Sequence, residues 1–487
     1  MSDTYLRLAA RAVPSAHTQP DAPPEPAVLT RTGTRLYLLA VFSLVISVID
    51  VPFLGVSLSA PLLGLVMLEI FFRPRYKFGR MRQTAILWGI LFLIMLGLVQ
   101  LIASAQHEIP TLDALRPLIQ WVFWIVSLLV VVYVGREARL LKQTVILFGI
   151  GIMVTAGLRL FESARAGDFS ATFAPRINSQ NNYGILFSMF AVYTLYLFIA
   201  VRKSARLPVL IGIALTFSAL IINGSRSSWL AVTVGVFTLS LVYVLSYPRL
   251  IPLYVAGLIA GGIFLAILSP YLPSQFQNIF EERIETFEDL DSDKSFLIRQ
   301  LMIDKGLQVF SENPLFGVGL GRFTQTSVPL VLPPRLRYAD EAYFNRKPPH
   351  NSYIALLSET GLAATLPYAA LFITAVVLGL RAAIRCVRHA LYLGAFAYAS
   401  LIGMSVHLFT LTGLTGTAPW VVYGLMIALI YYARDLPAQA PPAAPQPNKA
   451  AFSAYAPSPT NGRSAPFMPS VPPNPYRSAD PSTGKPR

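Results

Sequence analysis

The apolar residues of the chain fall into long stretches that predict membrane-spanning helices. Twelve such stretches lie between Leu36 and Ala433. A helix of about 20 apolar residues crosses a hydrocarbon layer of about 30 Å, because its backbone amides bond within the segment. The predicted spans run approximately over residues 36–55, 57–72, 84–104, 117–134, 144–160, 183–201, 207–223, 228–246, 251–269, 362–380, 390–411 and 417–433. The pattern therefore predicts an all-α polytopic membrane protein.

One long polar segment interrupts the spans and divides the chain. We expect a large loop over residues 270–351, with nine spans before it at 36–269 and three after it at 352–433. Residues 1–35 form a polar tail, and residues 434–487 form a second tail rich in Pro, Ala and Ser. A composition of this kind buries too little apolar surface to offset the entropy of ordering. Both tails are predicted to be disordered.

Positive charge gathers in alternate loops, and this sets the predicted orientation. The net charge is +15, although only 13% of the residues are charged and 54% are hydrophobic. Short loops rich in Lys and Arg stay in the cytoplasm, whereas long translocated loops escape this rule. The cations that follow the even-numbered spans are Arg73, Arg75, Lys77, Arg80, Arg82, Arg136, Arg139, Lys142, Arg202, Lys203, Arg206, Arg249, Arg381, Arg385 and Arg388. Both termini are then cytoplasmic and the long loop lies outside. Because topology accounts for the charge, we expect no nucleic-acid partner.

Cysteine usage gives no sign of a metal site. The single cysteine, Cys386, falls in a stretch that we predict to be a basic cytoplasmic loop. One thiol excludes both an intramolecular disulfide and a site of several thiolates. The acidic cluster between Glu281 and Asp293 lacks the full calcium-loop pattern. We therefore expect no metal.

The turn Asn223–Trp229, between the seventh and eighth spans, combines helix-capping residues with an arginine. Asn223, Ser225 or Ser227 could cap the eighth helix, which would leave its positive dipole end beside Arg226. Helix N-termini and arginine side chains both bind phosphate oxygens. The turn is a candidate site for a diphosphate attached to a membrane-embedded chain. The alternative is an arginine that reaches out to lipid headgroups.

A candidate general base lies where the long loop re-enters the membrane. Of the five histidines, His350 alone stands between a long outer loop and a membrane helix. A neutral imidazole can accept a proton from a sugar hydroxyl near neutral pH. A headgroup or capping contact is the alternative interpretation. His407, inside the eleventh predicted span, is a secondary candidate because ionisable groups within membranes are often functional.

Two further outer stretches contribute cations. Asp289–Phe323 is predicted to form a helix and a glycine turn, and Arg299 is its candidate residue, with an arginine on a solvated helix face as the alternative. The run Gly317–Gly321 lacks the preceding strand of a dinucleotide site and predicts a flexible turn. Ala174–Asn182 offers Arg176 with several amides, a combination that suits sugar hydroxyls or phosphates. A polar loop that orders itself over the lipid interface fits this last stretch equally well.

The order of these pieces resembles the O-antigen ligase and polysaccharide polymerase family of bacterial inner-membrane proteins. The resemblance rests on Ser225 with Arg226, on Arg299 before the string from Glu312 to Gly321, on the string from His350 to Tyr353, and on that from Glu359 to Gly361. Twelve spans with cytoplasmic ends are a feature of that family. The resemblance implies a fold of the polyprenyl-phosphate glycosyltransferase type, with one large periplasmic loop, in the bacterial inner membrane.

The resemblance also implies an activity and roles for the candidate residues. A glycan carried on undecaprenyl diphosphate would be transferred to an acceptor hydroxyl, without a metal or nucleotide cofactor. Arg226 and Arg299 would neutralise charge that develops on the departing diphosphate, and His350 would deprotonate the acceptor. Arg176 would help to hold the donor. The supporting residues are Ser225 and Asn351.

Three functions remain open at the level of sequence. An O-antigen ligase transfers the glycan to lipid A-core, whereas a polymerase adds it to another lipid-linked repeat or to a growing exopolysaccharide. The long outer loop with its single well-placed histidine favours the ligase. The alternative from another class is a transporter or flippase, which places ionisable groups near the bilayer midplane. The candidates for such groups are Asp50, Glu69 and His407.

Overall fold

The computed structural model describes residues 28–46, 50–51, 56–72, 84–107, 111–168, 180–268 and 294–436. Within these ranges the protein is helical, apart from one antiparallel pair of two-residue strands, β1 (Asp50–Val51) and β2 (Val56–Ser57). The helices are α2 (Arg31–Ile46), α3 (Ser59–Phe72), α4 (Thr84–His107), α5 (Thr111–Val134), α6 (Ala138–Ala166), α7 (Gln180–Phe190), α8 (Val192–Ala200), α9 (Arg206–Ile222), α10 (Arg226–Ser246), α11 (Ile251–Leu268), α13 (Lys294–Glu312), α14 (Glu341–Asn345), α15 (Ser352–Arg388), α16 (Leu393–Leu408) and α17 (Thr417–Asp435). The predicted all-α fold class is confirmed for this part of the chain.

Every predicted span overlaps a helix or a bent pair of helices, although the first, predicted over 36–55, is helical only as far as Ile46 among the described residues. Among the described residues, six helices are long and apolar enough to cross a membrane, or seven if α7 and α8, bent by 42°, form one span. These helices support a multi-pass membrane protein. α3 and α16 are apolar but shorter, at 14 and 16 residues. The full number of twelve spans therefore stays a prediction.

Some predicted boundaries differ from the structure. α2 begins at Arg31, before the predicted end of the N-terminal tail at residue 35. Residues 1–27, the acidic cluster before Lys294 and the tail from residue 437 lie outside the described residues. The predicted disorder of the tails is therefore not tested.

The prediction that Cys386 lies in a loop is wrong. Cys386 lies within the last turns of α15 and is fully buried. Arg385 and Arg388 in the last turn suit the negative end of the helix dipole, so the helix continues past its apolar stretch. Gly394 packs directly against the Cys386 side chain, because a Cβ at that position would lie 2.7 Å from the cysteine Cβ.

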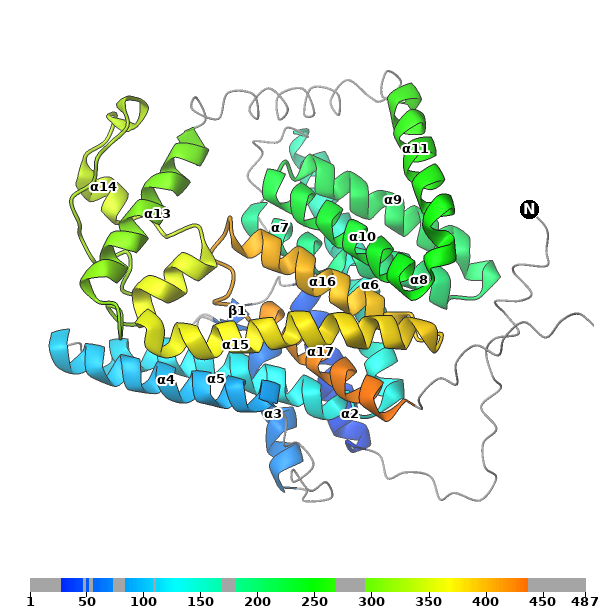
Figure 1. The fold of residues 1–487 in the computed structure, drawn as a ribbon, viewed down its shortest axis with the longest axis horizontal. Helices are drawn as coiled ribbons and strands as arrows, with labels where there is room; N and C mark the ends of the chain where they lie inside the picture. Colours follow the sequence, from blue (N-terminus) through cyan, green and yellow to red (C-terminus); the bar gives the residue numbers. More distant parts are fainter. Residues whose placement is uncertain are drawn as a thin grey trace, which may run out of the picture. The chain divides into compact units, whose positions relative to one another are not determined.

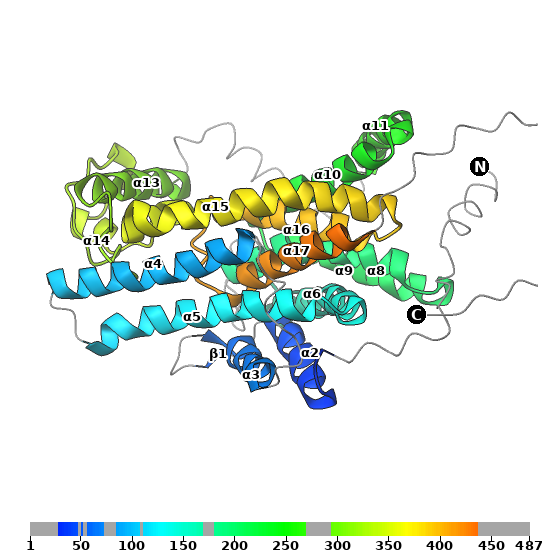
Figure 2. The ribbon, with the colours of Figure 1, turned by 60° about the horizontal axis from the view of Figure 1, so that its bottom comes forward.

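Four long helices share an aromatic core. α4 packs against both α5 and α15, and α17 packs against the same two helices (Figures 1 and 2). Phe92 of α4 meets Trp121, Tyr368 and Trp420 of the three neighbours, with ring centroids 5.4, 5.7 and 5.7 Å away. Ring pairs at such separations stabilise a core beyond the apolar area that they bury. These helices pack around the part of α15 that follows its kink at Gly361.

α10 contacts α15 directly, and α16 packs against both of them. At their C-terminal ends the Tyr247 hydroxyl donates to the Val387 carbonyl at 3.0 Å, and Arg388 donates to the Leu245 carbonyl at 3.5 Å. We call this the basic end, defined by Arg249, Arg385 and Arg388. Residues at the N-terminal ends of α10 and α15 lie at the opposite end, where they line one cavity.

α13, α14 and the chain between them form a small outer unit with its own apolar cluster (Figure 1). The cluster consists of Leu297, Leu301, Met302, Val309, Val318, Phe323, Val328, Leu330, Leu336 and Phe344. Lys305 of α13 is fully buried and donates to the backbone carbonyls of Phe323 and Asn345. A buried ammonium needs such partners, so this lysine ties α13 to both later segments of the unit.

Candidate functional site

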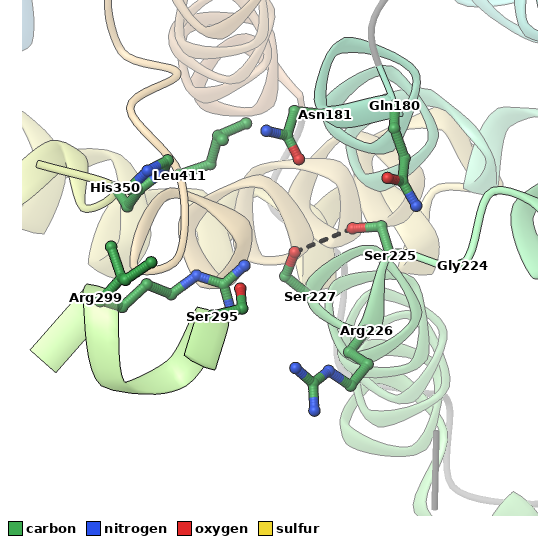
Figure 3. Close-up of a pocket in the computed structure, with 11 residues that line it drawn as sticks. Gln180, Asn181, Gly224, Ser225, Arg226, Ser227, Ser295, Arg299, His350 and Leu411 are labelled. Carbon is green, nitrogen blue, oxygen red and sulfur yellow. Dashed lines mark hydrogen bonds between the residues drawn. The ribbon is translucent and has the colours of Figure 1, made fainter. Parts of the chain in front are cut away.

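A polar cavity of about 390 Å³ lies where four helices begin (Figure 3). α7, α10, α13 and α15 each contribute their first residues or the residues just before them. The lining residues are Gln180, Asn181, Gly224, Ser225, Arg226, Ser227, Ser295, Ile298, Arg299, His350 and Leu411. Leu411, after the end of α16, is a fifth contribution. The topology prediction places all five segments on the same side of the membrane, and the structure brings them together at one end of the helices.

The electrostatics of the cavity favour an anion. Each helix N-terminus carries a partial positive charge, and residues at or near four such ends line this space. Arg226 and Arg299 add two guanidinium groups, and none of the lining residues is acidic. Phosphate groups bind where helix N-termini and arginines meet. The cavity is thus a plausible place for a phosphorylated ligand.

The two arginines reach the cavity from different elements. Arg226 is the first residue of α10, whereas Arg299 lies in the second turn of α13, across the cavity (Figure 3). Both are half-buried. Arg299 therefore does not lie on a fully solvated helix face, which was the alternative interpretation of its position. The structure brings together the two cations that the sequence proposed as partners.

Ser225 holds the N-cap position of α10, preceded by Gly224 with a φ of 63°. Its hydroxyl does not bond to an amide of the helix. Instead it pairs with the hydroxyls of Ser227 at 3.1 Å and Ser228 at 2.8 Å. This hydroxyl cluster borders the cavity beside Arg226.

His350 faces the same cavity from the segment that precedes α15. Burial, together with the positive charges of Arg299 and Lys347, lowers the pKa of His350 below its ordinary value of 6.5. A histidine with such a pKa is neutral at neutral pH and can accept a proton. The predicted base therefore lies beside one of the predicted cations.

Asn351 has a structural contact instead of a place in the cavity lining. Its side-chain oxygen accepts from the amides of Tyr353 at 2.9 Å and Ile354 at 3.1 Å, which makes it the N-cap of α15. The cap fixes where the helix starts. Asn351 therefore supports the site indirectly, because it fixes the backbone next to His350.

The strings at Glu312–Gly321 and Glu359–Gly361 pack against each other beneath the outer unit. The amides of Gly321 and Phe323 donate to the Glu359 carboxylate at 2.9 and 3.3 Å. Gly361, with a φ of 58°, breaks α15 so closely against Leu315 that a Cβ there would lie 2.4 Å from a backbone carbon. The glycine turn, predicted to be flexible, is therefore docked onto the kink of α15.

His407, the secondary candidate, lies in α16 and is almost completely buried. It neighbours the backbone of Ser227 and interacts electrostatically with Arg299. It is absent from the cavity lining. His407 therefore packs behind the first turn of α10, close to the proposed site.

The remaining sequence predictions fall elsewhere. Arg176 lies outside the described residues, so its place is not tested. Glu69, one of the ionisable groups considered for transport, accepts hydrogen bonds from the amide and hydroxyl of Thr30 at 2.7 and 2.8 Å. This contact ties α3 to the start of α2. Among the described residues, no cluster of three His, Cys, Asp or Glu side chains is placed to hold a metal ion.

Several lining residues were not singled out from the sequence. Gln180 and Asn181 belong to the amide-rich stretch after Arg176. Ser295, Ile298 and Leu411 had no predicted role in the site. The predicted alternation of loops was the available signal, because it places the loop around Leu411 on the same side as His350. Which residues of those loops meet depends on packing between distant helices.

Comparison with known families identifies the central part of the chain. Residues 211–369 match the family model described as O-antigen ligase. The segment contains Arg226, Arg299 and His350, and it confirms the resemblance to that family. No curated protein shows significant similarity to the chain. Residues 211–369 thus match the O-antigen ligase family, and the described residues include several helices of the kind found in multi-pass membrane proteins.

Proposed function

We propose that the protein transfers a glycan from undecaprenyl diphosphate to an acceptor hydroxyl at the periplasmic face of the bacterial inner membrane. One observation carries the proposal: Arg226, Arg299 and His350 line the same cavity. These residues come from three separate segments, each selected from the sequence for one step of this reaction. The match of residues 211–369 to the O-antigen ligase family supports the same class of glycan transfer.

The arginines act on the donor. As the bond between the anomeric carbon and the diphosphate oxygen breaks, negative charge grows on the departing diphosphate. Arg226 and Arg299, together with the helix N-termini, are positioned cations and donors for that charge in a partly dehydrated space. Preorganised groups of this kind are worth about 3–4 kcal/mol each in related sites.

His350 acts on the acceptor. Its neutral imidazole takes the proton of the acceptor hydroxyl while the hydroxyl oxygen forms a bond to the anomeric carbon. Undecaprenyl diphosphate leaves, and the proton stays on His350 until it passes to solvent. Attack opposite the leaving group inverts the anomeric carbon. No nucleotide is consumed, because the diphosphate linkage already activates the sugar.

Lipid A-core is the acceptor that we propose, and a second lipid-linked glycan is the alternative. The two differ in where the polymer ends up, so the identity of the product distinguishes ligase from polymerase. A ligase produces glycan joined to lipid A-core. A polymerase produces longer glycan that is still joined to undecaprenyl diphosphate.

A reconstituted transfer assay tests the proposal. Purified full-length protein receives undecaprenyl-diphosphate glycan with either lipid A-core or a second lipid-linked glycan, without an ion gradient or nucleotide. We expect product with lipid A-core, and His350→Ala to lower the rate about 100- to 10,000-fold. His389→Ala is the matched control, because His389 lies at the opposite end of α15.

Two results would overturn the proposal. Absence of product with both acceptors would contradict glycan transfer and favour the transport alternative. Full activity of the His350→Ala protein would show that His350 is not the base. A third result, product only with the lipid-linked acceptor, would keep glycan transfer but replace ligation by polymerisation.

A further inference from the structure

A buried arginine, Arg159, lies behind the Asn223–Ser227 turn that carries Arg226 into the cavity lining. Arg159 belongs to α6 and is fully buried, although the helix is apolar along most of its length. A charge at such a place needs polar partners, because burial of an unpaired guanidinium is very unfavourable in a membrane. The partners of Arg159 show what it holds.

Arg159 holds the end of α9 and the turn that follows it. Its guanidinium donates to the Ile222 carbonyl at 3.3 Å and to the Asn223 side-chain oxygen at 3.4 Å. A third donor reaches Ser163, one turn along α6, at 2.6 Å. The planar fork thus spans from α6 to Ile222 and Asn223, shortly before Ser225.

Asn223 connects Arg159 to α7, because it bonds both Arg159 and Gln180. Asn223 is fully buried, its side chain donates to the Gln180 carbonyl at 3.0 Å, and the Gln180 side chain donates back to the Asn223 carbonyl. Gln180 lines the cavity. Arg159 therefore reaches both the start of α7 and the start of α10 through one shared asparagine.

Two more contacts close the assembly. The Tyr183 hydroxyl of α7 donates to the Glu162 carboxylate at 2.8 Å, and Glu162 interacts electrostatically with Arg159. Gly184 lies so close to the turn that a Cβ there would be 2.4 Å from the Ser228 hydroxyl. α6, α7 and the first turn of α10 are thus locked together around Asn223.

We propose that Arg159 is a positioning residue, which fixes the Asn223–Ser227 turn so that Arg226 meets the diphosphate in the geometry that the reaction needs. Arg159 is absent from the cavity lining, so it acts through Asn223 and the backbone. A misplacement of about 1 Å caused by a change outside the reacting groups can cost about 100-fold in rate. For its kinetic part, this inference rests on the proposed glycan transfer.

The test compares Arg159→Lys and Arg159→Met with the wild-type full-length protein. Lysine keeps the charge beside Glu162 but cannot bond the Ile222 carbonyl and Asn223 with a planar fork. Thr144→Val is the matched control, because Thr144 is also buried on α6 and bonds Tyr37 at 2.8 Å, far along the helix from Arg159. We expect both Arg159 variants to lower kcat/KM for the donor at least tenfold while the KM for the acceptor stays unchanged. The control should alter neither.

A second measurement reports the turn without any substrate. Trp229 lies in the first turn of α10, and its indole donates to the Leu220 carbonyl of α9 at 2.9 Å, across the turn. In protein labelled with 5-fluorotryptophan, the fluorine resonance that disappears in Trp229→Phe belongs to this side chain. We expect Arg159→Lys to shift that resonance, and Thr144→Val to leave it in place.

Each outcome has a defined consequence. A shifted resonance with a lower kcat/KM for the donor and an unchanged KM for the acceptor supports the inference. An unshifted resonance, unchanged kinetics, or a raised KM for the acceptor overturns it. If Arg159→Met is not recovered as folded protein, Arg159→Lys decides alone. If the wild-type protein transfers no glycan, the proposed function fails, and the fluorine resonance still shows whether Arg159 holds the turn.

Discussion

His350 has a backbone conformation that histidine seldom adopts. Its φ of 49° lies in the left-handed region, which costs a residue with a Cβ about 1–2 kcal/mol. The conformation persists because Asn351 immediately fixes the start of α15. Strain of this kind often accompanies a side chain that must point in a particular direction. Here it directs the imidazole toward the cavity that Arg299 enters from the outer unit.

The pKa of His350 gives the pH dependence of transfer. The neutral imidazole is the proposed base, so activity is lost as the pH falls through its pKa, which burial, Arg299 and Lys347 place below 6.5. Lys347→Met removes one of the charges that lower this pKa. We therefore expect the acidic limb of the kcat/KM profile to move to higher pH in this variant. Lys294→Met, at an exposed lysine of the same outer unit, should leave the limb unmoved; an identical shift would mean that Lys347 has no specific effect.

The two arginines of the cavity are expected to act on one group. Arg226→Gln and Arg299→Gln should each lower kcat/KM for the donor about 100- to 1,000-fold. The double variant should lose less than the product of the two, since both cations serve the same diphosphate. Steady-state kinetics of the four proteins measures the coupling, with Arg335→Gln as an exposed control. If the loss in the double variant equals the product of the two single losses, the arginines act independently and do not serve the same diphosphate.

At the scale of elements, the kink of α15 connects the outer unit to the membrane helices. The amides of Leu362 and Ala363 donate to the carbonyls of Pro314 and Leu315 at 2.9 Å, so the second part of α15 is capped by the loop after α13. The break at Gly361 makes room for this loop. α13, which carries Arg299, is therefore fixed relative to the segment that carries His350.

Replacement of Gly361 by Ala should separate these two segments. The new Cβ would collide with backbone atoms of Leu315 at 2.4 Å, and the φ of 58° is unfavourable for alanine. We expect a loss of stability of about 1–3 kcal/mol and a loss of transfer that exceeds it. Thermal unfolding followed by tryptophan fluorescence, together with the transfer assay, gives both values. Gly97→Ala is the control, because its Cβ would meet nothing within 4 Å; equal behaviour of the two variants would contradict the proposed coupling.

At the scale of the whole membrane part, α10 and α15 connect the cavity to the basic end. Positive short loops mark the cytoplasmic side in membrane proteins. The basic end holds Arg249, Arg385 and Arg388, and the cavity lies at the other ends of the same two helices. We therefore expect the cavity to open away from the cytoplasm.

Cysteine labelling in intact cells tests this orientation. Glu312→Cys in the outer unit should react with a membrane-impermeant maleimide, whereas Lys203→Cys should react only after the membrane is permeabilised, because both positions are exposed and lie on opposite predicted sides. The native Cys386 is fully buried and should react only after denaturation, which makes the unaltered protein a blank. Labelling of Lys203→Cys from outside would reverse the topology.

The sequence predicted the helices well, since membrane spans are local patterns of apolar residues. Arg226, Arg299 and His350, which line one cavity, were selected as ionisable groups in the predicted outer segments. The partnership of Arg159 with Asn223 was missed, since it depends on the distance between α6 and the end of α9. Cys386 was misplaced because a basic stretch predicts a loop even where a helix continues through it. Distances between segments far apart in sequence are set by packing, and no local pattern records them.

The size of the cavity has a consequence for what the protein can recognise. A space of about 390 Å³ is near the lower limit of pockets that enclose a drug-sized molecule. In the proposed reaction a space of this size would accommodate the diphosphate and the sugar next to it, and the rest of a long polymer would extend into the surrounding water. Such an enzyme would recognise the linkage between diphosphate and sugar but not the distal part of the polymer. We therefore expect similar transfer rates for polymers of very different length.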